Sequence, residues 1–287
     1  MQESIRAATG VAALQIGFGG MPLSIKGRPS EEAGRRVLNA AIDAGMTLID
    51  TADVYCLYDD DIGHNERLIA SIGRNDEIHV ATKAGLRRPG GSWMSDGSPK
   101  HIREACERSL RALQTEQLWL YQFHAPDPKV PFEKSVEAFA ELQREGKFRW
   151  FGVSNVSLAQ LDAASRILPV ASVQNRLSPY SRESIAIARE CARRDILFLA
   201  YSPLGGRRLA KKLHELAPLR QVAEARGVSV QQVAIAWARA QGRTVIPIPG
   251  ARTVEHAVDS ARAADLVLSR EELFLLYSSP LEETTES

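Results

Sequence analysis

The sequence has few cysteines, no long apolar run and no signal-like start. Its 287 residues include only three scattered cysteines, Cys56, Cys106 and Cys191, which indicates a reducing compartment rather than a disulfide framework. No apolar run approaches the roughly 20 residues that span a bilayer. The first ten residues, MQESIRAATG, lack the apolar core of a secretory signal. We therefore expect a cytoplasmic protein that does not enter a membrane.

The sequence also lacks an excess of charge of either sign. Lysine and arginine number 36, aspartate and glutamate 35, and the formal net charge is +1. This balance gives no electrostatic reason to expect nucleic acid or an anionic membrane surface as a partner. We expect a small-molecule ligand, and the lack of an obvious assembly segment favours a monomer.

What the sequence does contain is a regular alternation of strand and helix patterns. Eight runs are continuously apolar, as parallel strands buried on both faces are. They span residues 14–19, 46–52, 78–83, 118–124, 148–154, 170–175, 196–202 and 244–250. Helical patterns separate most of them, for example SEEAGRRVLNAAIDAG, with Ser30 as a candidate N-cap and Gly45 as a stop. Eight such units predict an α/β fold, a (β/α)8 TIM barrel with residues 1–287 in one domain.

The competing architecture is a doubly wound open sheet. Such a sheet would carry a dinucleotide-binding fingerprint after its first strand. The nearest candidate, GFGGMP at residues 17–22, lacks the third glycine and has Pro22 where a helix should continue. The closed barrel is therefore the better prediction.

Ionisable residues stand at the C-terminal ends of the predicted strands, where barrel enzymes place their active sites. The second strand ends in Asp50 and runs into Tyr55, Lys83 ends the third and His124 ends the fourth. Taken singly, each has a structural explanation, as a helix cap, a solvated strand end or a packing residue. Their coincidence at one end of three neighbouring strands favours acid–base chemistry.

The residue types indicate which chemistry that is. A tyrosine has a pKa of about 10, and a neighbouring ammonium group would lower it. A carboxylate would keep the lysine charged, and a histidine could donate a hydrogen bond to a substrate oxygen. Together these groups could protonate an oxyanion as it forms, which reduction of a carbonyl requires. No side chain supplies hydride, so a nicotinamide cofactor would be needed.

Several segments, in order, resemble the aldo-keto reductase family over nearly the whole chain. They are DTADVY (50–55), ATK (81–83), YQFHAPD (121–127), REGKFRWFGVSN (144–155), SVQNRLSP (172–179), AYSPLGG (200–206) and IPIPGARTVEH (246–256). The resemblance implies an NADPH-dependent oxidoreductase that reduces an aldehyde or ketone to an alcohol. It implies Tyr55 as the general acid, Lys83 and Asp50 as the groups that tune it, and His124 as the group that orients the carbonyl.

The resemblance also implies an extended nicotinamide cofactor. The residues implied at the nicotinamide end are Gly20, Met21, Asp50, Ser154, Asn155, Gln174 and, stacked on the ring, Tyr201. Those implied at the pyrophosphate and adenosine ends are Ser202, Leu204, Gly205, Gly206, Gly250, Arg252, His256 and Asp259. Arg252 could be a solvated residue at a capped helix start, but an arginine there also suits a phosphate, which favours NADPH over NADH. His256 and Ser260 depart from the residues usual in the family.

The stretch YCLYDDDIGHNERL, residues 55–68, superficially resembles a calcium loop. Its ligand spacing fails, and His64 and Glu66 are not spaced to share a helix face, so we expect no metal. We expect its acids to form a solvated rim and Cys56 to be no redox switch. Tyr58 and Trp93 are candidates for substrate contact, and the glycine-rich loop around Trp93 fits either a mobile flap or a plain surface loop.

Two other functions stay open on the sequence alone. A Schiff-base lyase would use Lys83 as its nucleophile, but it leaves Tyr55 and Tyr201 without a role. A cofactor-binding regulatory subunit with slow turnover would keep the cofactor site, and an intact tetrad argues against it.

Overall fold

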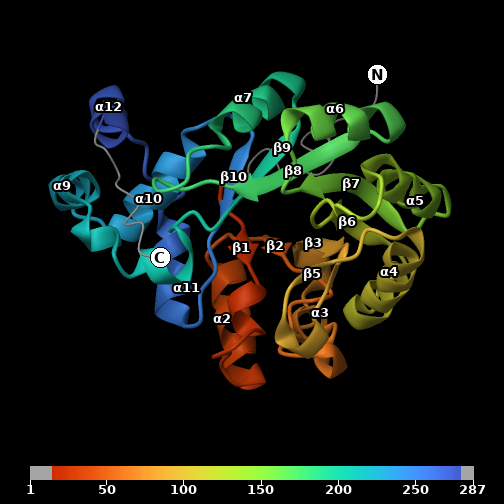
Figure 1. Ribbon diagram of the computed structural model, residues 1–287. Coiled ribbons are helices and arrows are strands. Elements are labelled where there is room, and N and C mark those ends of the chain that lie inside the picture. The colour runs from red at the N-terminus through yellow and green to blue at the C-terminus, as the bar shows by residue number, and fades with distance from the viewer. Residues whose placement is uncertain (1–14, 279–287) are drawn as a thin grey trace.

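Eight parallel strands form the centre of the computed structural model, which describes residues 15–278 (Figure 1). They are β1 (Phe18–Gly19), β2 (Leu48–Asp50), β3 (His79–Ala84), β6 (Leu118–Phe123), β7 (Phe148–Ser154), β8 (Val170–Arg176), β9 (Leu197–Tyr201) and β10 (Val245–Ile248). Each strand pairs with the next one in this order. Every predicted strand segment is found, although residue 14 of the first lies outside the described residues.

The sheet closes between its first and last strands. The Gly17 and Gly19 amides donate to Pro247 O and Pro249 O, each at 2.9 Å. A Cβ at Gly19 would lie 2.8 Å from Ile248 O, so only glycine allows this approach. The predicted (β/α)8 barrel is confirmed.

Helices surround the ring of strands (Figure 1). They are α2 (Glu31–Asp43), α3 (His64–Ala70), α4 (Pro99–Leu113), α5 (Phe132–Arg144), α6 (Leu158–Ile167), α7 (Ile185–Arg194), α10 (Val230–Arg239) and α11 (Val254–Arg262). The Ser30 hydroxyl accepts a hydrogen bond from the Ala33 amide and so caps α2, as predicted. Gly45, with φ 91°, follows the end of that helix.

Further elements lie in the connections. They are the antiparallel pair β4 (Leu86–Arg87) and β5 (Met94–Ser95), the helices α8 (Gly206–Ala210), α9 (Ala217–Arg226) and α12 (Arg270–Ser278), and the 3-10 turns η2 (Met21–Leu23), η3 (Asp59–Asp61), η4 (Asn75–Glu77), η5 (Pro89–Gly91) and η6 (Leu213–Glu215). The sequence predicted neither the β4–β5 pair nor α8. Both follow the C-terminal end of a barrel strand, so they lie at the functional end of the barrel.

The barrel interior changes from apolar to polar along its axis. One apolar group comprises Leu48, Ala81, Leu120, Leu197, Leu199, Ile246 and Ile248. Beyond it, toward the C-terminal ends of their strands, the buried side chains are polar: Asp50, Lys83, Gln122, Ser154 and Gln174. The apolar group therefore forms a floor beneath a polar layer. Within residues 15–278, no helix combines the length and the apolar character needed to cross a bilayer.

Candidate active site

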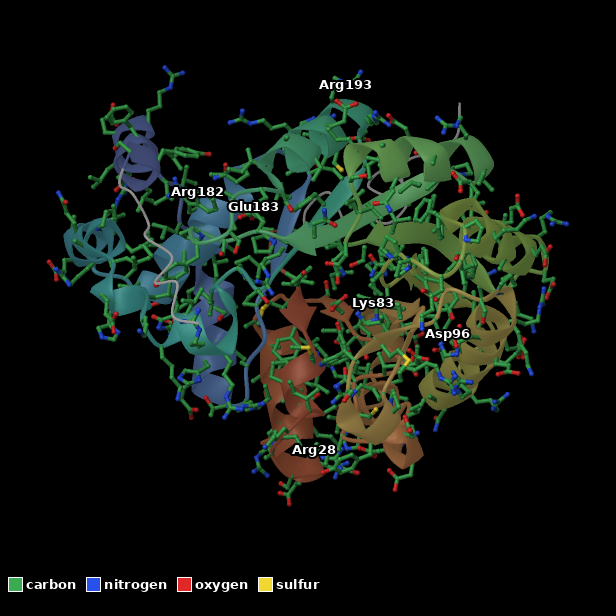
Figure 2. The ribbon with its side chains drawn as sticks, in the orientation of Figure 1. Arg28, Lys83, Asp96, Arg182, Glu183 and Arg193 are labelled. Carbon is green, nitrogen blue, oxygen red and sulfur yellow. The ribbon has the colours of Figure 1, made fainter. Side chains whose placement is uncertain are left out.

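Three ionisable side chains meet in the polar layer. Lys83 Nζ lies 2.6 Å from Asp50 Oδ1 and 3.1 Å from the Tyr55 hydroxyl oxygen. It also donates to the Thr51 carbonyl at 2.7 Å. Lys83 is fully buried and lies near the centre of the molecule (Figure 2). Lys83 is thus within hydrogen-bond reach of two other predicted catalytic residues, Asp50 and Tyr55.

Local structure sets this geometry. Successive side chains of a strand point to opposite faces, so in β3 Lys83 points into the barrel while Thr82 points toward the helices. Asp50 ends the neighbouring strand, and its Oδ1 also accepts from Gln174 Nε2 at 2.7 Å. The carboxylate is therefore held from two sides.

Burial acts on the charge of both partners. It lowers the pKa of Lys83 and raises the pKa of Asp50, while each partner's charge opposes the shift of the other. An ammonium group has three N–H donors, and three oxygens lie around Lys83 Nζ. The site is therefore arranged for the charged form of Lys83.

The Tyr55 hydroxyl differs from the expectation of an acidified phenol. Burial raises its pKa well above the ordinary value, and the charges of Asp50 and Tyr201 add to the rise. The expected lowering by Lys83 is thus outweighed by loss of water around the ring. Tyr55 holds its proton at neutral pH, as a proton donor must.

His124 lies against the same tyrosine. The two rings are 5.9 Å apart between centroids and nearly perpendicular, at 79°. Burial and the Lys83 charge lower the pKa of His124 well below its ordinary value, so the ring is neutral. Among the described residues its Nδ1 atom has no hydrogen-bond partner. All four predicted catalytic residues are therefore brought to one place.

Polar residues from β7 and β9 continue the site. Asn155 Nδ2 donates to the His124 carbonyl at 2.9 Å, and its Oδ1 accepts from the Tyr201 hydroxyl at 2.8 Å. Ser154 Oγ donates to the Gln174 carbonyl at 2.7 Å. Asn155 has φ 57°, a conformation that residues other than glycine adopt mainly where the surrounding structure imposes it. These residues form a connected rim beside His124.

The loops after β1, β9 and β10 meet at a basic region. Arg252 donates from Nε to Pro22 O and from Nη2 to Lys26 O, each at 3.0 Å. Arg207 approaches the same loop, because a Cβ at Gly27 would lie 3.7 Å from Arg252 Nη1 and 3.9 Å from Arg207 Nη1. Arg207 is a site candidate that the sequence reasoning missed, although the basic run after Gly206 was a visible signal.

A hollow and two glycines lie next to this region. The hollow has a volume of about 440 Å³ and is lined by Arg207, Arg208, Lys211 and Lys212. Gly205 and Gly206 both have φ 82°, which turns the backbone sharply ahead of α8. The preceding Ser202 also has a positive φ, 49°. The backbone therefore bends between Ser202 and Gly206, and the basic side chains that follow it line the hollow.

The other predicted cofactor residues lie at varied positions. Gly20 lies against Asp50 O and Asn65, and Met21 packs beside Tyr55. A Cβ at Gly250 would lie 2.6 Å from Pro22 Cγ. His256 is exposed and Leu204 packs on the core. Asp259 accepts from Ser229 Oγ at 2.7 Å and from Gln232 Nε2 at 2.6 Å, so its carboxylate already joins α11 to α10.

Trp93 forms one wall of the site beside Tyr55. Their ring centroids are 6.3 Å apart at 84°, and Trp93 is 48% exposed. The buried Arg88 guanidinium lies 3.9 Å from the Trp93 ring centroid and donates to the Cys56 carbonyl at 3.2 Å. Arg88 thus fixes Trp93, a role that the sequence did not reveal. Tyr58, the other predicted substrate residue, is 58% exposed.

The acidic run after Tyr58 is divided in its roles. Asp59 and Asp60 are exposed, as expected for a solvated rim. Asp61 instead forms an ion pair with Arg28, which lies near α2 (Figure 2). In the described part of the chain, no three histidine, cysteine or acidic side chains are grouped to hold a metal ion. Burial raises the pKa of the Cys56 thiol to about 11, which disfavours the reactive thiolate.

The chain is similar to known proteins over nearly all of its length. The model described as the Aldo/keto reductase family matches residues 15–277. The aldo-keto reductase yakc (NADP(+)) of Schizosaccharomyces pombe is 30% identical, over 88% of this chain and 84% of that protein. Among solved structures, an aldo-keto reductase from Klebsiella pneumoniae in complex with NADPH has a TM-score of 0.78 and 30% identity, covering 94% and 93% of the two chains. A glycerol dehydrogenase from Gluconobacter oxydans has a TM-score of 0.80 and 27% identity, covering 95% of each chain.

Proposed function

The chain belongs to the aldo/keto reductase family, and we propose that Asp50, Tyr55, Lys83 and His124 are its catalytic residues. The protein is an oxidoreductase that reduces an aldehyde or ketone to an alcohol with NADPH. The observation that carries the residue assignment is the position of Lys83 Nζ between Asp50 Oδ1 and the Tyr55 hydroxyl.

The residues around the site fit NADPH. Two arginines, Arg207 and Arg252, face the same loop and offer the paired cations that a phosphate binds. At Gly206 a Cβ would meet only Ser202 Oγ, at 4.0 Å, so the backbone there is open to a pyrophosphate. Asn155, which already bonds to His124 and Tyr201, would hold the nicotinamide carboxamide. When bound, the cofactor supplies the hydride that no side chain can provide.

The catalytic residues would divide the proton chemistry among them. Tyr55 holds its proton at neutral pH and donates it to the carbonyl oxygen as negative charge develops there. Lys83 stabilises the phenolate that remains, and Asp50 keeps Lys83 charged and in place. Neutral His124, beside the Tyr55 ring, would donate a hydrogen bond that orients the carbonyl.

Trp93 and Tyr58 are the proposed substrate contacts. Trp93 presents a half-exposed indole next to the Tyr55 ring, and the Arg88 guanidinium lies over that indole in a cation–π contact. A flat apolar group attached to the carbonyl would pack on that indole. Tyr58, three residues after Tyr55, is more exposed than Trp93.

The two other functions have less support. A Schiff-base lysine attacks as a neutral amine, whereas Lys83 is fully buried and hydrogen-bonded to three oxygens. A regulatory subunit would not need Tyr55 and Lys83 in contact. Because Cys56, Cys106 and Cys191 are all unpaired, we also propose a reducing, cytoplasmic setting. We propose separately that the protein acts as a monomer.

The test is turnover with a panel of aldehydes and ketones. We expect NADPH to be oxidised only when a carbonyl is present, with one alcohol formed per NADPH. Titration of the protein's fluorescence with NADPH, without substrate, measures binding separately. Tight binding without turnover of any carbonyl would instead support the regulatory subunit.

A further inference from the structure

Two acidic side chains that the mechanism does not use lie behind the catalytic residues. Asp53 and Glu66 are both fully buried. Asp53 Oδ1 and Glu66 Oε2 each have no hydrogen-bond partner among the described residues. Isolated buried carboxylates are costly, and buried polar atoms normally have partners. Two such acids in one place therefore require an explanation.

Their positions connect the two halves of the catalytic site. Asp53 lies two residues before Tyr55, and its carbonyl accepts from the Gly63 amide at 2.7 Å, at the start of α3. Glu66 in α3 accepts from Thr82 Oγ1 at 2.6 Å. Thr82 is the strand neighbour of Lys83 and points to the opposite face. Glu66 thus holds the Lys83 strand from outside the barrel, the Asp53 backbone joins the Tyr55 loop to α3, and Asp50 holds Lys83 from inside.

Few charges face these acids. From α4, Arg108 Nη2 approaches Asp53 Oδ2 at 3.5 Å and is the cation in direct contact. The other titratable or charged groups that interact electrostatically with them are Arg67 on α3, Lys83 on β3, Tyr121 on β6 and Cys56 next to Tyr55. Lys83 is already paired with Asp50. Arg67 is exposed and donates to the Ile62 carbonyl at 2.8 Å. Among the described residues, Arg108 is therefore the one cation in direct contact with the acids, and it balances only one of the two carboxylates.

We propose that Asp53 and Glu66 form a buried acid pair that holds one proton, and that the singly protonated pair positions Tyr55 against Lys83. This inference rests on the proposed catalytic roles of Tyr55 and Lys83. Loss of the proton would place a second negative charge behind Lys83. That charge would make Tyr55 a weaker proton donor and push the two acids apart.

The acid–base properties of the pair agree with this. Burial, followed by the Glu66 charge, raises the pKa of Asp53 to about 8, against the opposing effect of Arg108. Burial also raises the pKa of Glu66, opposed first by its hydrogen bond with Thr82. Such coupled acids titrate as a pair, so the measured ionisation belongs to both.

The kinetic test is the pH dependence of kcat for carbonyl reduction. Asp53→Asn mimics the protonated acid, so its kcat at pH 7 should stay within about threefold of the wild type. The wild type should lose roughly tenfold in kcat from pH 7 to pH 9, and Asp53→Asn should lose less than about twofold. Asp60→Asn changes an exposed acid of the same loop and should keep the wild-type profile. An unchanged alkaline loss in Asp53→Asn, or an equal loss of kcat at every pH, overturns the proposal.

A stability measurement tests the proton without using activity. The melting temperature of Asp53→Asn should exceed that of the wild type at pH 8, and the difference should shrink toward pH 5. Glu66→Gln should show the same trend, which covers the case in which Asp53→Asn folds poorly. A difference that does not change with pH contradicts the shared proton. A wild type that reduces no carbonyl would refute the proposed function, whereas the melting curves would still decide whether the pair holds a proton.

Discussion

At the scale of the residue, burial rather than contact alone sets the chemistry of the site. Lys83, Tyr55 and His124 are all buried, and burial is the first cause of the pKa shift in each. The sequence placed these residues at strand ends and so could predict their convergence. It could not predict that burial outweighs Lys83 at Tyr55, because the amount of water around a side chain depends on the packed structure.

The two arginines of the basic region lead to the residue-scale prediction. Arg252→Ala or Arg207→Ala should weaken NADPH binding by about tenfold or more, since each removes one charged partner of a phosphate, worth about 1.5–3 kcal/mol. NADH binding should change by less than about twofold. Fluorescence titration measures both, and Arg262→Ala, an exposed arginine of α11, serves as the control.

An equal loss for both cofactors would give Arg252 a different role. Its hydrogen bonds to Pro22 O and Lys26 O would then matter because they hold the first loop, not because the guanidinium binds phosphate.

At the scale of the element, the connections determine what the barrel accepts. The β4–β5 pair has two residues in each strand, too few for any alternation to be recognised in the sequence. Its turn passes through Gly90 and Gly91, both with positive φ, and so brings Trp93 back toward Tyr55. The glycines predicted a loop from the sequence, but the direction in which the loop runs depends on tertiary contacts such as that of Arg88 with Trp93.

The β4–β5 pair makes a prediction about substrates. Trp93→Ala should raise KM for aromatic aldehydes and ketones by about tenfold, because stacking and buried area are lost together. KM for small aliphatic aldehydes should change little. Steady-state kinetics on both classes measures this. Met94→Ala is the matched control, since Met94 is also 48% exposed and lies next in the chain. A similar rise in Met94→Ala, or none in Trp93→Ala, would remove Trp93 from the substrate site.

At the scale of the whole molecule, the closed barrel was predictable from eight apolar runs and their helices. The runs are strong signals because both faces of each strand are buried. The weakest sequence signal was that of the first strand, which has only two residues in the structure. The glycine amides in and before this strand donate hydrogen bonds to the carbonyls of Pro247 and Pro249 and so close the barrel. The structural contacts of Asp61 and Asp259 could not be predicted from the sequence, because their partners Arg28 and Ser229 are distant in the chain.

The buried ionisable groups predict a stability maximum near neutral pH. Burial lowers the pKa of His64, His101 and His124, so folding stability is lost as pH falls below about 6.5, where the unfolded histidines gain protons. Burial raises the pKa of Asp53, so stability is also lost as pH rises from about 4 toward 8. Thermal melts between pH 5 and pH 9 should therefore show a melting temperature that falls on both sides. A melting temperature that rises steadily to pH 9 would contradict this.

The most direct test of the central claim is single-turnover hydride transfer by the wild type and by Tyr55→Phe. Each protein is first saturated with NADPH, which fluorescence titration confirms, and is then mixed with an aldehyde that the wild type reduces. Tyr277→Phe makes the same change on α12, where the hydroxyl donates to Gln241, and is the control. The account predicts that Tyr55→Phe binds NADPH normally but oxidises it about 10²–10⁴-fold more slowly, because the carbonyl oxygen loses its proton donor. A Tyr55→Phe rate within tenfold of the wild-type rate would show that Tyr55 is not the acid and that the proposed catalytic site is wrong.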